Sequence, residues 1–141
     1  MSTIAYVLGG KDDMTGTLEQ ENINKLLSMI GLSYKGNWSP GPITDWVMDP
    51  VTNGVQKITA TNGMSCDDMG TVVARDQFMN CVLQIKEVGM GHVAMWADDW
   101  ITYNTLWQNL KDEQVERLWL NVIKYLTPPK QCQVPIPDRI N

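Results

Sequence analysis

The stretch His92-Val93-Ala94-Met95-Trp96-Ala97 is a continuous apolar run that leads directly into Asp98-Asp99-Trp100. A second run of the same kind, Ile4 to Leu8, leads through Gly9-Gly10 into another acidic turn. Short unbroken apolar runs are typical of strands that are covered on both faces, as in parallel sheets. We therefore expect these two strands to stand side by side at the centre of a layered sheet.

Helices are expected near both ends of the chain. Apolar residues recur at helical spacing from Ile23 to Ile30, after a Thr17–Gln20 capping pair, and Gly31 suits the left-handed end of that helix. A second apolar face runs from Val115 to Leu126, and the prolines that follow at 128 and 129 stop the helix.

The middle of the chain predicts a long irregular connection over residues 32–54, a strand over 55–60 and a hairpin of strands 71–75 and 81–88. Strand–helix units at both ends with a hairpin between them indicate an α/β fold. We expect a three-layer sandwich with a mixed, mostly parallel sheet. Residues 1–129 would form one domain, and residues 130–141 an extended C-terminal tail that contains proline.

The charge of the chain argues against polyanionic partners. Eleven basic residues are scattered among sixteen acidic ones, for a net charge of −5. Nucleic acids and anionic membranes bind clustered Lys and Arg, so neither is an expected partner. The N-terminus lacks a cationic leader pattern, and no apolar run approaches a membrane span. The sequence as written therefore predicts a cytoplasmic protein.

Few residues are available for nucleophilic or redox chemistry. Cys66, Cys81 and Cys132 lie too far apart in the sequence for a disulfide framework, and no two have C-x-x-C spacing. Cys81 is expected in the core, and two acids beside Cys66 raise the pKa of its thiol. His92, the single histidine, begins a strand and so lies at the wrong end of the sheet for the expected site. No catalytic residue is assigned.

Four carboxylates follow the two apolar strands: Asp12 and Asp13 after the first, Asp98 and Asp99 after the second. Ligands in open α/β sheets bind outside the carboxyl ends of the strands. Neighbouring strands would bring the four together, and a hard cation such as Mg²⁺ or Ca²⁺ would suit them. Alternatively, each aspartate bonds its own loop or faces water, as loop aspartates commonly do.

Aromatic residues recur near the same turn. Trp96, Trp100, Tyr103 and Trp107 follow one another at spacings of four, three and four. Such a stripe could stack on a sugar or another flat ligand. The alternative is core packing between the strand end and the next helix.

Residues 89–103 resemble a G-x-G-H-V-hydrophobic-D-E-W-I-T-Y strand and turn of domains in large exported proteins of myxobacterial type. Segments 42–46, 49–55 and 114–121 are similar to other blocks of those domains, from about Ile4 to Pro137 overall. Asp99 stands where the similar sequences tend to have Glu. The resemblance implies a shortened class I glutamine-amidotransferase-like, flavodoxin-like fold. The chain lacks the G-x-C-x-G turn and the His-x-Glu pair that an amidotransferase needs.

Two functions are compatible with these features. We expect a non-catalytic binding or interaction domain that recognises a small molecule or protein through acidic and aromatic side chains: Asp98, Asp99, Trp100, Tyr103, Trp96 and Trp107. The alternative is a small metal-assisted hydrolase that uses Asp12, Asp13, Asp98 and Asp99. A missing outer strand would leave an unpaired apolar edge, so we also expect a homodimer across that edge or the Trp-rich surface.

Overall fold

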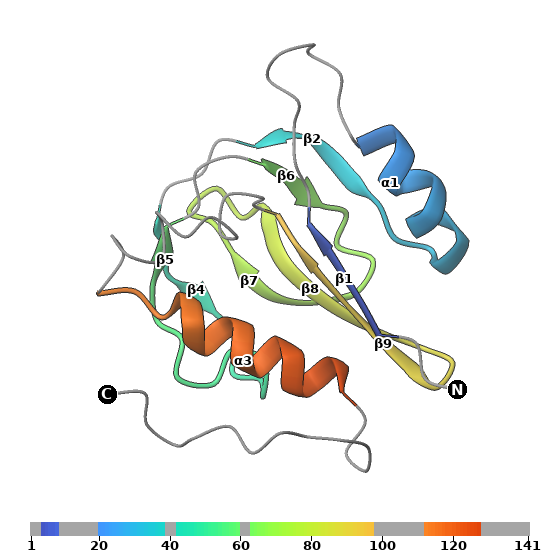
Figure 1. Ribbon diagram of the computed structural model, residues 1–141. Coiled ribbons are helices and arrows are strands. Elements are labelled where there is room, and N and C mark those ends of the chain that lie inside the picture. The colour runs from blue at the N-terminus through green and yellow to red at the C-terminus, as the bar shows by residue number, and fades with distance from the viewer. Residues whose placement is uncertain (1–3, 9–19, 39–41, 60–62, 98–111, 128–141) are drawn as a thin grey trace.

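A computed structural model describes residues 4–8, 20–38, 42–59, 63–97 and 112–127 of the chain. Within these ranges a seven-stranded sheet carries one helix on each face, and two further strands form a small separate pair (Figure 1). The predicted tail, residues 130–141, lies outside the described residues. None of the described helices is long and apolar enough to cross a membrane.

The elements follow one another along the chain in this order: β1 (Ile4–Leu8), α1 (Gln20–Leu27), the 3₁₀ turn η1 (Ser28–Ile30), β2 (Tyr34–Trp38), β3 (Pro42–Ile43), β4 (Asp45–Trp46), β5 (Ile58–Thr59), β6 (Gly63–Cys66), β7 (Thr71–Arg75), β8 (Cys81–Val88), β9 (Gly91–Trp96) and α3 (Val115–Leu126). The main path of the large sheet is β1-β9-β8-β6-β2; β7 also pairs with β8, and β4 pairs with β7. β3 pairs with β5.

The sheet is predominantly antiparallel, so the predicted α/β sandwich with a mostly parallel sheet is wrong. β1 and β9 run parallel, with Leu8 opposite Trp96. Every other pairing among the described strands is antiparallel. The flavodoxin-like and amidotransferase-like architecture that the resemblance implied is wrong for the same reason. The two apolar strands are neighbours as expected, but β1 stands at the end of the sheet path and not at its centre.

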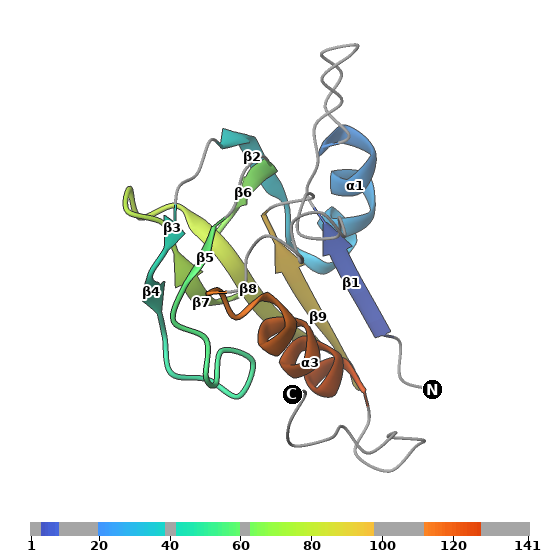
Figure 2. The same ribbon diagram turned by 60° about the vertical axis from the view of Figure 1, so that its left-hand side comes forward.

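The apolar run of β9 reflects cover on both faces of the sheet, between the parallel neighbour β1 and the antiparallel neighbour β8. Ala94 and Trp96 face the cluster that includes α3, whereas Val93 and Met95 face the cluster beneath α1. Figure 2 shows α3 lying across β9, with β1 at the margin of the sheet. Unbroken apolarity therefore correctly indicated two covered faces, but it carried no information on the direction of the neighbouring strands.

The helices and the hairpin are confirmed. Gly31 ends the first helical segment with φ of 66°, as its position predicted. The β7–β8 hairpin turns at Asp76, whose carboxylate accepts hydrogen bonds from the backbone N–H groups of Phe78 and Asn80. The Thr17 end of the predicted capping pair lies outside the described residues.

The irregular connection predicted for residues 32–54 instead contains β2, β3 and β4, and the strand predicted over 55–60 shortens to β5. β6 was not predicted at all. β2 contains Gly36 and Asn37, which disfavour strands locally, but its pairing with β6 overrides that preference.

Candidate functional site

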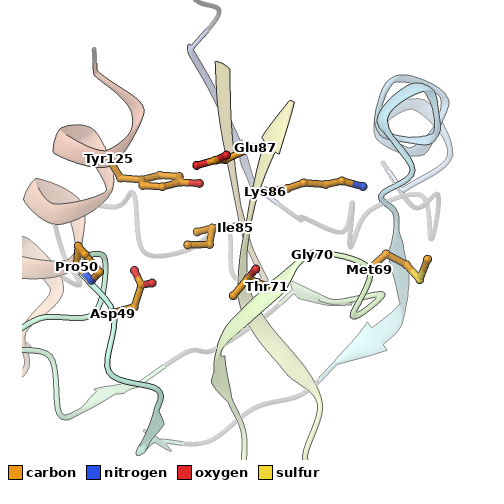
Figure 3. A pocket seen from close by; sticks show the side chains of 9 residues that line it. All are labelled: Asp49, Pro50, Met69, Gly70, Thr71, Ile85, Lys86, Glu87 and Tyr125. Atoms are coloured by element: carbon orange, nitrogen blue, oxygen red, sulfur yellow. The ribbon is translucent and has the colours of Figure 1, made fainter. Parts of the chain in front are cut away.

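An open pocket of about 650 Å³ lies between α3, the 49–50 turn and one end of β7 and β8. Residues 49–50, 69–71 and 85–87 line it together with Tyr125 (Figure 3). The side chains of Asp49, Glu87 and Tyr125 gather at one end around Ile85, whereas Met69 and Lys86 lie at the other. One end of the pocket is therefore acidic and aromatic.

Hydrogen bonds hold the turn that carries Asp49. The Asp49 carboxylate accepts a hydrogen bond from the Val51 N–H at 2.8 Å, the geometry expected of an aspartate at the start of a turn. Val51 is buried in the core. From α3, the Asn121 amide donates to the carbonyl oxygens of Val51 and Asn53, at 3.0 and 2.8 Å. The long connection is thus tied to the helix that supplies Tyr125.

Two carboxylates act on the phenol of Tyr125. Burial raises the pKa of Tyr125, and the negative charges of Glu87 and then Asp49 raise it further. Lys86 does not neutralise this end, because its Nζ donates to the carbonyl oxygens of Ile30 and Gly31, at 2.8 and 3.4 Å. There the ammonium group also suits the negative end of the first helical segment.

His92 contacts Tyr125, one of the residues that line the pocket. Its ring stacks on Tyr125 with centroids 4.5 Å apart, and its Nδ1 lies 2.7 Å from the Tyr125 carbonyl oxygen. A carbonyl oxygen only accepts, so this Nδ1 carries the proton and donates. Its Nε2 lies 3.9 Å from a Glu87 carboxylate oxygen. The single histidine therefore has a structural role, in which it packs against Tyr125.

A buried hydrogen-bond network stands next to the pocket wall. Gln84 is fully buried; its Oε1 accepts from the Gly70 N–H, and its Nε2 donates to Asp67, both at 2.8 Å. Partial burial by itself would raise the pKa of Asp67. The hydrogen bonds from Gln84, the Met69 N–H and Ser33 outweigh it and lower the pKa.

This lowered pKa predicts acid sensitivity. Because the folded-state pKa of Asp67 lies below its unfolded value, its stabilising contribution is present above about pH 4 and is lost as the pH falls through the folded-state value. We expect the free energy of unfolding, measured with urea at pH 5 and at pH 3, to fall more in the native chain than in Asp67→Asn. Equal losses in the two proteins would contradict the assignment, since the remaining acids titrate in both.

Both described cysteines are free and buried, at the start of β8 and the end of β6. Cys81 is a core residue, as predicted. The pKa of the Cys66 thiol is raised, first by its burial, then by the neighbouring Cys81 and by the charges of Asp67 and Asp68. The acids act in the predicted direction, but burial is the larger cause. Cys66 is thus not an activated nucleophile.

Most of the site predicted from the sequence lies outside the described residues: Asp12, Asp13, Asp98, Asp99, Trp100, Tyr103 and Trp107. Trp96 is described and fully buried, and it stacks on Trp46 with centroids 6.4 Å apart. Its indole N–H has no hydrogen-bond partner among the residues that the structure describes. Within the described ranges, no group of three His, Cys, Asp or Glu side chains could hold a metal ion.

Sequence reasoning missed the pocket residues. The Asp49-Pro50 pair was recognised only as part of a loop, although an aspartate before such a turn is a signal for local hydrogen bonding. Glu87 lies on a strand and Tyr125 on a helix, at positions that do not stand out in the pattern of either element. Their convergence is set by how α3 crosses the sheet.

In comparisons with known proteins, the chain matches no family model, and no curated protein or solved structure is significantly similar to it.

Proposed function

We propose that the chain is a binding domain that holds a small ligand with a positively charged group in the pocket between α3 and β8. One observation carries the proposal: Asp49 and Glu87, from separate elements, both line the pocket beside the Tyr125 side chain (Figure 3), and their charges add to the effect of burial in raising the pKa of its phenol. Among the described residues that line this pocket, the one amine, Lys86, is engaged with the carbonyl oxygens of Ile30 and Gly31. An ammonium or guanidinium group would complement the two carboxylates.

The rest of the pocket suits a short apolar body attached to that cation. Ile85 lies between the two carboxylates, and Pro50 and Met69 add apolar surface (Figure 3). A volume of about 650 Å³ falls within the range of roughly 300–1,000 Å³ typical of small-molecule sites. Alkylamines and alkylguanidines have this combination of a cationic end and an apolar chain.

The described residues favour binding over catalysis at this site. Nucleophilic mechanisms need a base within reach of an activated nucleophile. Here the Nδ1 of His92 is engaged with a backbone carbonyl, and the Cys66 thiol is buried in a different cluster. Asp49 and Glu87 are the carboxylates in the described part of the pocket lining, and both lie where they would pair with a cation.

Removing either carboxylate is expected to weaken cation binding about tenfold, the loss typical of one charge-assisted hydrogen bond. The variants are Asp49→Asn and Glu87→Gln, and the probes are n-butylamine and butylguanidine, titrated calorimetrically. Glu116→Gln is the matched control, because Glu116 is an exposed α3 carboxylate outside the pocket lining. It removes the same charge from the protein and should leave the affinity nearly unchanged.

Butyrate provides the ligand control, since it has a similar apolar chain with the opposite charge. The proposal predicts that butyrate does not compete with butylamine. Equal binding of the amine and the carboxylate, or equal weakening by all three variants, would contradict a cation site at this end of the pocket.

The site predicted at the carboxyl ends of the central strands remains a second candidate, and one observation favours it. β1 and β9 are parallel neighbours, and Leu8 pairs with Trp96. The two described strands therefore end side by side, and Asp12, Asp13, Asp98 and Asp99 follow these ends in the sequence. For this site we retain the proposed small-molecule or protein ligand near Trp100 and Tyr103, with a metal-assisted hydrolase as the alternative. Mg²⁺ or Ca²⁺ should raise the melting temperature if the alternative holds.

We also retain the proposal of a homodimer. Among the described strands β1 pairs with β9 alone and stands at the end of the sheet path, as a strand available for edge pairing would. A monomer in light scattering at high protein concentration would refute it.

A further inference from the structure

Cys66 and Cys81 are distant in the sequence but directly opposed in the sheet. They are Cα partners on the neighbouring antiparallel strands β6 and β8. Opposed residues of antiparallel strands have Cα atoms about 4.5–5.5 Å apart, within the range of about 4.4–6.8 Å that a disulfide spans. Both side chains belong to the same buried cluster, so they point to the same face of the sheet. Their distance along the sequence argued against a disulfide, but the sheet places the two residues directly opposite each other.

We propose that Cys66 and Cys81 form a reversible disulfide, and that this pair is an oxidation site within the sheet. With a peroxide as oxidant, one thiol reacts to give a sulfenic acid and one water molecule. The second thiol then displaces the hydroxyl group, which leaves as water, and the S–S bond forms. The two sulfur atoms lose two electrons in total, and both electrons reduce the peroxide.

The surroundings of the pair control when it reacts. Cys66 and Cys81 are 0% and 1% exposed, and Cys66 also lies opposite Tyr34 of β2. Leu27 of α1 and Leu32 belong to the same cluster. Because the thiolate is the reactive form and burial disfavours it, the closed fold protects the pair. Oxidation requires local opening of the α1 and β2 cover, so its rate should rise at urea concentrations that do not yet unfold the chain.

The disulfide would close the segment between β6 and β8. That segment contains Met69, Gly70 and Thr71, which form one wall of the pocket, while Ile85 and Glu87 lie beyond it on β8. Oxidation would therefore fix this wall relative to β8. An effect on cation binding rests on the proposed function, whereas the disulfide itself does not.

The test uses the full chain with hydrogen peroxide, in the folded state and at low urea, followed by alkylation of the remaining thiols and peptide mass analysis. We expect a Cys66–Cys81 cross-link with the loss of two hydrogen atoms, reversed by dithiothreitol. A disulfide that closes a loop of this size is expected to raise the melting temperature by about 10 °C. Cys132→Ala should retain the cross-link and the shift, and Cys66→Ala or Cys81→Ala should lose both.

The mass analysis of the native chain decides the outcome even if a cysteine variant does not fold. Oxidation that stops at sulfinic acid on either residue would overturn the proposal, as would a disulfide formed only with Cys132. So would a cross-link that lowers the melting temperature, because it would show that the sheet geometry does not accommodate the bond. If neither the reduced nor the cross-linked chain binds butylamine while the cross-link still forms, the result would count against the proposed pocket and not against the disulfide.

Discussion

Replacing Gly70 with alanine is expected to lower the free energy of unfolding by about 3 kcal/mol, at the upper end of the usual cost of overpacking. A Cβ at this position would lie 2.8 Å from the Ile85 carbonyl oxygen and 3.1 Å from the Gln84 Oε1. The carbonyl belongs to the backbone of β8 and cannot rotate away. The same displacement would lengthen the 2.8 Å hydrogen bond from the Gly70 N–H to Gln84. Urea unfolding followed by tryptophan fluorescence measures the loss.

Gly89→Ala is the matched control, because it separates crowding from backbone conformation. Gly89 has φ of 60°, and a Cβ there would meet no atom within 4 Å. Its substitution should cost about 1 kcal/mol, the penalty for placing a side chain in the left-handed region. Gly70→Ala must be clearly the more destabilising of the two. Equal losses would mean that the close approach of Gly70 to β8 does not limit the packing.

Local sequence patterns predicted the individual elements of the fold better than the pairing of its strands. The β7–β8 hairpin, both helices and the adjacency of β1 and β9 followed from local patterns: alternation, helical spacing and unbroken apolar runs. None of these patterns specifies the direction of neighbouring strands or the other long-range strand pairings. The β2–β6 pairing joins residues such as Tyr34 and Cys66, whose local sequences contain Gly and Asn and predict loops. The predicted strand orientation, mostly parallel, was consequently wrong.

The pocket was harder to predict than the fold because its parts have no common local signal. Asp49 comes from a turn, Glu87 from a strand and Tyr125 from a helix, and only the crossing of α3 over the sheet brings them together. The Cys66–Cys81 pair illustrates the same limit, since it exists only through the register of β6 and β8. The pattern that did attract attention, acidic turns after apolar strands, correctly placed two strand ends side by side. It gave no indication of this pocket at the opposite end of β9, near His92.

Gln84→Leu is expected to cost about 2–3 kcal/mol, because leucine fills the space but satisfies none of the buried polar groups that Gln84 serves. The Gly70 N–H would lose its acceptor, and Asp67 would lose the donor that contributes most to lowering its pKa. Burial would then act on Asp67 with less opposition, so its pKa should rise toward the ordinary value. The variant should therefore lose less stability than the native chain between pH 5 and pH 3.

The double variant Gly70→Ala/Gln84→Leu tests whether the two residues act through one network. If they do, the second substitution removes a hydrogen bond that the first has already strained, and the combined loss falls short of the sum by at least about 0.5 kcal/mol. Fully additive losses would contradict a shared network. Thr71→Ala is the control for position, since Thr71 is exposed at the same end of β7, and its change should stay within about 0.5 kcal/mol. Strong coupling would identify Gln84 as the residue that fixes the pocket wall to the sheet, because Gly70, which lines the pocket, has its N–H bound to Gln84.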